Sequence, residues 1–131
     1  MVWEDIENMF NIFGGGNSAD EIKQINPEEA LKIIEKNKGE KTLILDVREP
    51  HEFKGNLGHI KNAQLVPLKL LPLKVKELEK NKEDDIIVVC HSGARSYSAC
   101  NILKRHGFKN VYNLKGGMIL WKKLGMISHN D

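Results

Sequence analysis

The residues with the clearest chemical potential form a short run that begins at a cysteine. Cys90 follows the apolar stretch 86–89 and opens the sequence C-H-S-G-A-R-S, in which Gly93 suits a tight loop. We expect a helix to begin near Arg95 or Ser96. The backbone N–H groups of such a loop and the N-terminus of the helix would then point at one sulfur atom, which favours a thiolate and holds an anion. Cys90 is therefore a candidate nucleophile.

The other residues of this run would form the binding site around the sulfur. Arg95 places a fixed positive charge at the far lip of the loop. Ser96 caps the helix, stabilises the loop, or does both. His91 either donates to a bound anion or shuttles a proton, or it is a solvent-facing residue of the lip. The expected anion-binding loop consists of His91, Ser92, Gly93, Ala94 and Ser96.

Several polar residues elsewhere are given structural roles. We interpret Asp46 and Arg48 as an ion pair that holds the loops, and His59 as a packed, hydrogen-bonded core histidine. Cys100 is interpreted as a half-buried helix residue, and a resolving thiol for Cys90 is the alternative. No metal site is expected, because the cysteines and histidines near this loop include no C-x-x-C pair.

The elements that must position Cys90 alternate between strands and helices. Strands are expected at 22–25, 43–45, 64–66, 86–89 and 111–114. Helices are expected from Asn26-Pro27 to Gly39, in a Leu- and Lys-rich stretch to about Lys80, after the Cys90 loop, and around Trp121. This alternation predicts an α/β fold with a parallel sheet and helices on both faces. Ligands of such sheets bind beyond the carboxyl ends of the strands, where Asp46 and Cys90 are expected.

Composition and charge favour one soluble domain that acts on a small anion. The chain has 131 residues and a net charge of +2. Residues 1–30 contribute −6 and the remainder +8, so the body is basic. No basic run interleaved with aromatic residues is present, which argues against nucleic-acid binding. With two cysteines, no signal-peptide pattern and no long apolar stretch, we expect a cytoplasmic protein that does not bind membranes.

The first residues differ from the rest of the chain. Apolar side chains recur at helical spacing between Trp3 and Phe13, and the Gly-rich stretch 14–18 follows as a hinge. We expect this amphipathic helix to pack on the body or on a second copy of the chain, which leaves a dimer open. The predicted organisation is an N-terminal helix and linker over 1–20, a domain over 21–126 and a tail over 127–131.

The motifs together resemble the single-domain rhodanese family of sulfurtransferases. The matching pieces, in order, are 45–48 (L-D-V-R), 52–53 (E-F), 58–60 (G-H-I), the Cys90 run, 107–108 (G-F) and 114–117 (L-K-G-G), followed by Trp121. The resemblance implies a twisted parallel sheet and a cofactor-free, ping-pong transfer of sulfane sulfur. Cys90 would take sulfur from a small anionic donor such as thiosulfate, with Arg95 holding the donor. A small thiol, a thioredoxin-like protein or cyanide would accept it.

Two other functions use the same residues. A non-catalytic relay module would accept a persulfide from a partner protein without using thiosulfate. Tyrosine-type phosphatases also close an anion loop with Cys and Arg, and arsenate chemistry belongs to the same class. Their loop has one more residue between Cys and Arg than the four found here, 91–94, so we rank them below sulfur transfer.

Overall fold

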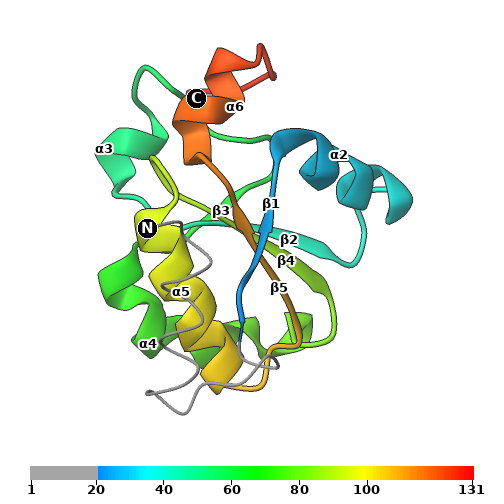
Figure 1. The fold of residues 1–131 in the computed structure, drawn as a ribbon. Coiled ribbons are helices and arrows are strands. Elements are labelled where there is room, and N and C mark those ends of the chain that lie inside the picture. The colour runs from blue at the N-terminus through cyan, green and yellow to red at the C-terminus, as the bar shows by residue number, and fades with distance from the viewer. Residues whose placement is uncertain (1–20) are drawn as a thin grey trace, which may run out of the picture.

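The computed structural model describes residues 21–131, which form one parallel sheet covered by helices (Figure 1). The expected helix between Trp3 and Phe13 lies outside the described residues. Five strands are ordered β1-β5-β4-β2-β3, and every neighbouring pair is parallel. The strands are β1 (Lys23–Ile25), β2 (Thr42–Asp46), β3 (Gln64–Leu65), β4 (Asp85–Val89) and β5 (Asn110–Leu114). This topology confirms the fold class predicted from the sequence.

The helices lie on both faces of the sheet. In chain order they are α2 (Pro27–Lys36), α3 (Pro50–Phe53), the 3₁₀ segment η2 (Leu68–Leu70), α4 (Leu71–Lys74), the 3₁₀ segment η3 (Val75–Asn81), α5 (Ala94–Arg105) and α6 (Gly117–Lys123). The expected start of α2 is confirmed. Asn26 accepts from the Glu29 N–H at 2.8 Å, and Glu29 accepts from the Asn26 N–H at 2.9 Å.

The central strands alternate their side chains between two hydrophobic clusters. In β4, Ile86 and Val88 pack with α4 and α5, while Ile87 and Val89 pack with α2 and α6. Leu43 and Leu45 in β2 face the first cluster, and Ile44 faces the second. Both faces of the sheet are therefore buried, which explains why these strands are continuous apolar runs in the sequence.

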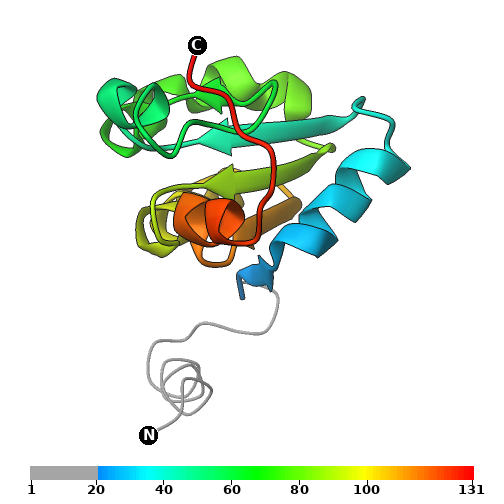
Figure 2. The ribbon, with the colours of Figure 1, turned by 90° about the horizontal axis from the view of Figure 1, so that it is seen from above.

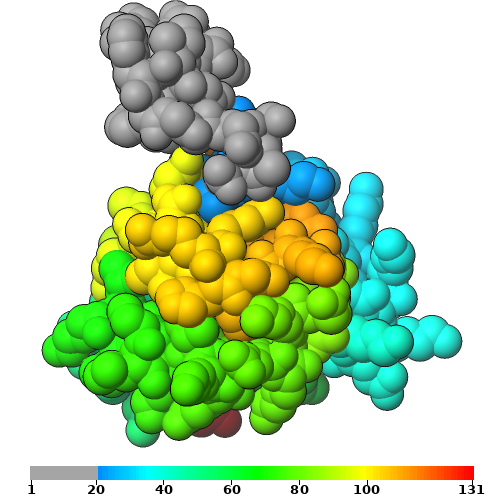
Figure 3. All heavy atoms as spheres, turned by 90° about the horizontal axis from the view of Figure 1, so that it is seen from below, coloured from blue at the N-terminus to red at the C-terminus, as the bar shows by residue number. Residues whose placement is uncertain are grey.

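The Leu- and Lys-rich stretch differs from its prediction. In place of one helix, the structure contains η2, α4 and η3 in succession. Pro72 has no backbone N–H and is accommodated in the first turn of α4. Leu71, Val75 and Leu78 are buried at helical spacing, so packing against the sheet holds this stretch although its hydrogen bonding is irregular. Figure 3 shows this stretch, in green, beside the C-terminal half of α5, in gold.

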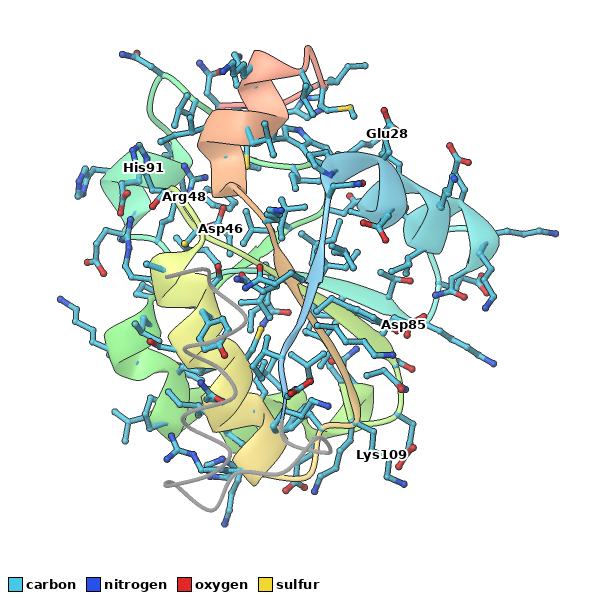
Figure 4. The ribbon with its side chains drawn as sticks, viewed as in Figure 1. Glu28, Asp46, Arg48, Asp85, His91 and Lys109 are labelled. Carbon is cyan, nitrogen blue, oxygen red and sulfur yellow. The ribbon has the colours of Figure 1, made fainter. Side chains whose placement is uncertain are left out.

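The register of β2 and β4 brings the expected functional residues together. Asp46 pairs with Val89, so the segments that follow both strands emerge side by side. The N–H of Val47 continues the pairing by donating to Val89 at 2.9 Å. Figure 4 shows Asp46, Arg48 and His91 gathered at this edge, whereas Asp85 and Lys109 lie toward the opposite end.

The C-terminal segment returns to the same edge of the sheet (Figure 2). His129 forms an isolated antiparallel bridge with His59: the His59 N–H donates at 2.6 Å, and the His129 N–H donates at 2.8 Å. The prediction that His59 is a packed, hydrogen-bonded residue is correct. Its ring stacks on Phe53 with centroids 3.6 Å apart, and its Nδ1 lies 2.8 Å from the Phe53 carbonyl.

Two side chains in or next to α5 lie elsewhere than the sequence pattern indicates. Helical spacing from Ile102 and Leu103 predicts His106 on the inner face, but His106 is exposed at the C-cap of α5, with Nδ1 2.9 Å from the Ile102 carbonyl. Cys100 is fully buried, not half-buried. Burial raises the pKa of the Cys100 thiol well above its ordinary value, so this sulfur stays protonated.

We expect Cys100→Ala to lower the free energy of unfolding by about 1 kcal/mol, because it leaves a small cavity in a packed core. The sulfur transfer that the resemblance implies for Cys90 should be unaffected. Chemical denaturation and sulfur loading, measured on the same preparation, check both expectations. An internal Cys90–Cys100 disulfide in the oxidised protein, visible by mass, would instead identify Cys100 as a resolving thiol.

Candidate functional site

The sulfur of Cys90 lies at the end of β4, at the base of the loop that leads into α5. The residue is 1 % exposed. The Gly93 N–H donates to Sγ at 3.0 Å, and the Ser96 hydroxyl lies 3.3 Å from the same sulfur. A backbone donor and a hydroxyl donor therefore converge on one sulfur, an arrangement that stabilises negative charge on it.

Ser96 connects the nucleophile to a buried polar residue of β5. Its side chain is fully buried, and its hydroxyl makes a very short hydrogen bond to Oδ1 of Asn113. Asn113 is itself held, because its Nδ2 donates to Gln24 Oε1 at 3.0 Å and to the Gly93 carbonyl at 3.1 Å. A serine hydroxyl has a single proton, so Ser96 donates either to Asn113 or to the Cys90 sulfur.

The backbone of the loop is held from the other side by α6. The Met118 N–H donates to the Cys90 carbonyl at 2.9 Å, and the Ile119 N–H donates to the His91 carbonyl at 3.1 Å. In a planar trans peptide the N–H points opposite to the C=O. The N–H groups of His91 and Ser92 therefore point away from α6.

Two glycines allow this loop to form. Gly93 has a φ of 111°, which strains any residue with a Cβ, although a Cβ there would meet no atom closer than 3.5 Å. Gly117 also has a positive φ, 57°, and there is in addition no space for a side chain at this position. A Cβ would lie 2.5 Å from the carbonyl oxygens of Cys90 and His91. Gly117 thus lets the first turn of α6 approach the loop closely enough to bond it.

The remaining predicted site residues form the rim. His91, Ser92 and Ala94 are exposed, and Ala94 is the first residue of α5. Ser96 lies within the first turn of the helix rather than at its cap, which is Gly93. The alternative of Ser96 as a loop stabiliser therefore fits its contacts, and the solvent-facing interpretation fits His91.

Arg95 is paired with a carboxylate that the sequence analysis did not place in the site. Its Nη1 and Nη2 donate to Oε1 and Oε2 of Glu52 at 2.7 and 2.8 Å. This two-point bond lowers the pKa of Glu52 to about 2 and raises the pKa of Arg95. The pair is partly exposed, with Arg95 at 37 % and Glu52 at 21 %.

A second arginine fixes the short helix that carries Glu52. Arg48 is 1 % exposed and binds Asp46, with Nη2 and Oδ2 2.8 Å apart. It also donates to the backbone carbonyls of Glu52 at 3.3 Å and Gly58 at 2.7 Å. The structural interpretation of Asp46 and Arg48 is confirmed. Removing one partner would leave a buried charge, at a cost of about 3–5 kcal/mol.

Sequence reasoning missed three residues of this arrangement. Glu52 carried a signal only as part of a family pattern, because its partner is 43 positions away. Asn113 is a polar residue inside an apolar strand, which is a usable sign of a buried hydrogen-bond network. Gly117 carried a signal only as part of the 114–117 motif, and its approach to the Cys90 carbonyl becomes visible only once the fold is known.

The described residues also form a cavity that lies apart from Cys90, and they contain neither a metal-binding cluster nor a membrane-spanning helix. An apolar cavity of about 590 Å³ lies between α2, β2 and the C-terminal segment, with Trp121, Met126 and Ile127 in its wall. Within residues 21–131 no group of three or more His, Cys, Asp or Glu side chains could hold a metal ion. No helix in the same range is long and apolar enough to span a membrane.

Comparison with known proteins places this site in context. Residues 26–124 match the sequence model of the rhodanese-like domain. A sulfurtransferase of Allochromatium vinosum is 39 % identical over 87 residues, which cover 66 % of this chain and 78 % of that protein. A putative sulfur carrier protein of Bacillus subtilis is 36 % identical over 110 residues, or 82 % of this chain and 57 % of that protein.

Comparison with solved structures also identifies a rhodanese-related protein. A rhodanese-related protein of Thermoplasma volcanium superposes with a TM-score of 0.69 at 28 % identity. The match covers 83 % of this chain and 99 % of that one, so the two share nearly the whole fold.

The bond between Glu52 and Arg95 makes stability depend on pH. The folded-state pKa of Glu52, about 2, lies below its ordinary value of 4.5. Its contribution is therefore complete above pH 4.5 and is lost as the pH falls toward 2. We expect Glu52→Gln to unfold more easily than the wild type at neutral pH and equally easily near pH 2. Thermal unfolding across this range checks it, with Glu49→Gln as control; a gap independent of pH would contradict it.

Proposed function

Because the chain belongs to the rhodanese-like family, we propose that it is a sulfurtransferase that carries sulfane sulfur on Cys90 as a persulfide. The observation that carries this proposal is the surrounding of the Cys90 sulfur. It receives the Gly93 N–H and faces the Ser96 hydroxyl, in a loop whose carbonyls are held by α6. Such a site stabilises an anionic sulfur, first as a thiolate and then as a persulfide.

In the first half-reaction the Cys90 thiolate attacks the outer sulfur of the donor. With thiosulfate, the new bond joins Cys90 Sγ to that sulfur, and the sulfur–sulfur bond of the donor breaks. The bonding electrons leave with sulfite, so a thiolate and a thiosulfate dianion give a persulfide anion and a sulfite dianion. Ser96 can turn its proton toward the charged sulfur, because Asn113 and Cys90 compete for it.

In the second half-reaction an acceptor removes the outer sulfur. Cyanide attacks it to give thiocyanate and restores the Cys90 thiolate. A thiol attacks the same atom to give a new persulfide, so a small thiol or a thioredoxin-like protein serves as acceptor. Neither step consumes an external oxidant or reductant, and neither requires a cofactor. The need for a reduced Cys90 supports a cytoplasmic location.

A sulfur-relay module is the second candidate. It is favoured by the similarity to a protein of Bacillus subtilis named as a putative sulfur carrier. A relay also needs Cys90, but it receives its persulfide from another protein. Thiosulfate turnover by the purified chain separates the two functions. Phosphate or arsenate chemistry is less well supported, because the loop has four residues between Cys90 and Arg95.

The direct test is the intact mass of the protein after treatment with a sulfur donor. The wild type should gain one sulfur, which a thiol then removes. Cys90→Ser should gain none and should remain folded, because serine is nearly the same size but a far poorer nucleophile. Cys100→Ala is the matched control and should gain sulfur normally. Retained thiosulfate:cyanide activity in folded Cys90→Ser would refute the mechanism.

Arg95→Ala should lower kcat/KM for thiosulfate by about 10- to 100-fold, because it leaves the Glu52 carboxylate without its partner beside the loop. The uncompensated negative charge then repels an anionic donor. Arg95→Lys should recover only part of the activity, since lysine cannot make a two-point contact. Steady-state kinetics with thiosulfate and cyanide measure both variants. Unchanged kinetics in both would show that Arg95 only supports the loop.

A further inference from the structure

Glu52 already occupies the end of the Arg95 side chain. The two terminal nitrogens of Arg95 each bond one oxygen of Glu52, at 2.7 and 2.8 Å. This is the geometry in which a guanidinium binds the oxygens of a carboxylate, phosphate or similar anion. An oxyanion that approaches this end of Arg95 must displace Glu52, and one that approaches any other N–H of Arg95 meets a positive charge that Glu52 has already neutralised.

Hydrogen bonds within α3 hold Glu52 in place, which favours Glu52 over an incoming anion as the partner of Arg95. Its Oε1 also accepts the Glu49 N–H at 3.0 Å, which closes the first turn of α3. Its backbone carbonyl accepts from Arg48 at 3.3 Å, and Arg48 is anchored by the buried Asp46. Withdrawing Glu52 from Arg95 would therefore disturb the hydrogen bonds that begin α3.

The charge of the loop changes as a result. Arg95 is the one lysine or arginine between Cys90 and Ser96, so it supplies the fixed positive charge of this run. The Glu52 carboxylate, bonded directly to Arg95, cancels that positive charge, whereas an unpaired arginine would attract an anion strongly. A dianion such as thiosulfate therefore meets a neutral ion pair, one half of which is a carboxylate that repels it.

We propose that Glu52 determines donor specificity by keeping Arg95 from anionic donors, so that Cys90 takes sulfane sulfur from a donor of low charge, such as an organic persulfide. This inference rests on the proposed function. The Cys90 thiolate attacks the outer sulfur of R–S–SH, the S–S bond of the donor breaks, and R–S⁻ leaves with the electron pair. Cys90 retains the sulfur as a persulfide, and the leaving thiolate needs no cation of the kind that sulfite does.

Two sulfur donors of similar shape test the role of charge. Methanethiosulfonate replaces one charged oxygen of thiosulfate with a methyl group, so it carries one negative charge fewer. The rate of sulfur loading on Cys90, followed by mass, is measured with each donor. Glu52→Gln keeps the size of the side chain and one acceptor oxygen, which can still accept from the Glu49 N–H, but removes its charge and the second oxygen that Arg95 Nη2 binds. It should raise the thiosulfate rate about tenfold relative to the methanethiosulfonate rate, as expected for one unit charge close by.

Two further variants separate charge from structure. Glu49→Gln removes a carboxylate from the same segment that pairs with Lys69 rather than with Arg95, and an amide oxygen can still accept from the helix backbone. It should leave the ratio of rates near that of the wild type. Glu52→Asp keeps the negative charge, so its ratio should also stay near the wild-type value even if both rates fall. An unchanged ratio in Glu52→Gln, or an equal rise in Glu49→Gln or Glu52→Asp, would overturn the inference.

Alkylation provides a readout that does not depend on sulfur transfer. Iodoacetate is an anion, and iodoacetamide is neutral and nearly the same size. Glu52→Gln should raise the ratio of their rates with Cys90 severalfold, and an unchanged ratio would contradict the role given to Glu52. Failure of the sulfurtransferase function looks different: the wild type would then gain no sulfur from either donor, whereas the alkylation ratio would still respond to Glu52.

Discussion

The arrangement of the site depends on one buried ion pair, between Asp46 and Arg48. Asp46 ends β2 beside the strand that carries Cys90, and Arg48 follows two residues later with 1 % of its surface exposed. A guanidinium so deeply buried must use its donors, and it does so on Asp46 and on the carbonyls of Glu52 and Gly58. The Glu52 carbonyl belongs to α3, and the Gly58 carbonyl belongs to the turn that follows it. A charge that is costly to bury therefore fixes a segment that is too short to hold its own shape.

The position of Arg95 follows from this constraint. Its partner Glu52 sits on α3, so the charge at the rim of the loop is set by a segment anchored at the neighbouring strand. The sulfur itself is surrounded by a separate group of residues. Gly93, Ser96 and Asn113 contact it or one another without involving α3. The two roles that we propose, stabilisation of the sulfur and recognition of the donor, thus belong to different parts of the chain, so each can be altered while the other is retained.

Much of the fold could be predicted because its signals are local. The Asn26 capping box, the apolar runs of β2 and β4, and the glycine of the Cys90 loop all act within a few residues. The division of the Leu- and Lys-rich stretch into η2, α4 and η3 was missed because its apolar residues keep helical spacing. Leu71, Val75 and Leu78 are buried whether the backbone between them is α-helical or 3₁₀, so the apolar pattern alone does not distinguish the two. The Arg95–Glu52 pair was missed for a different reason. Both residues had been noted, but only the tertiary fold brings positions so distant in the chain into contact.

The bonds from α6 to the Cys90 loop also bear on motion. The first-turn amides of Met118 and Ile119 have no acceptor within α6 and donate instead to the carbonyls of Cys90 and His91, so the loop cannot open without leaving the N-terminus of α6 unpaired. Amide hydrogens of the two segments should accordingly exchange with solvent as one unit, although Cys90 and Met118 lie 28 positions apart in the chain. The conformational entropy of this loop is lost when the domain folds, not when a donor arrives. Catalytic loops are usually among the mobile parts of a protein, whereas this one is a rigid template to which the donor must adapt.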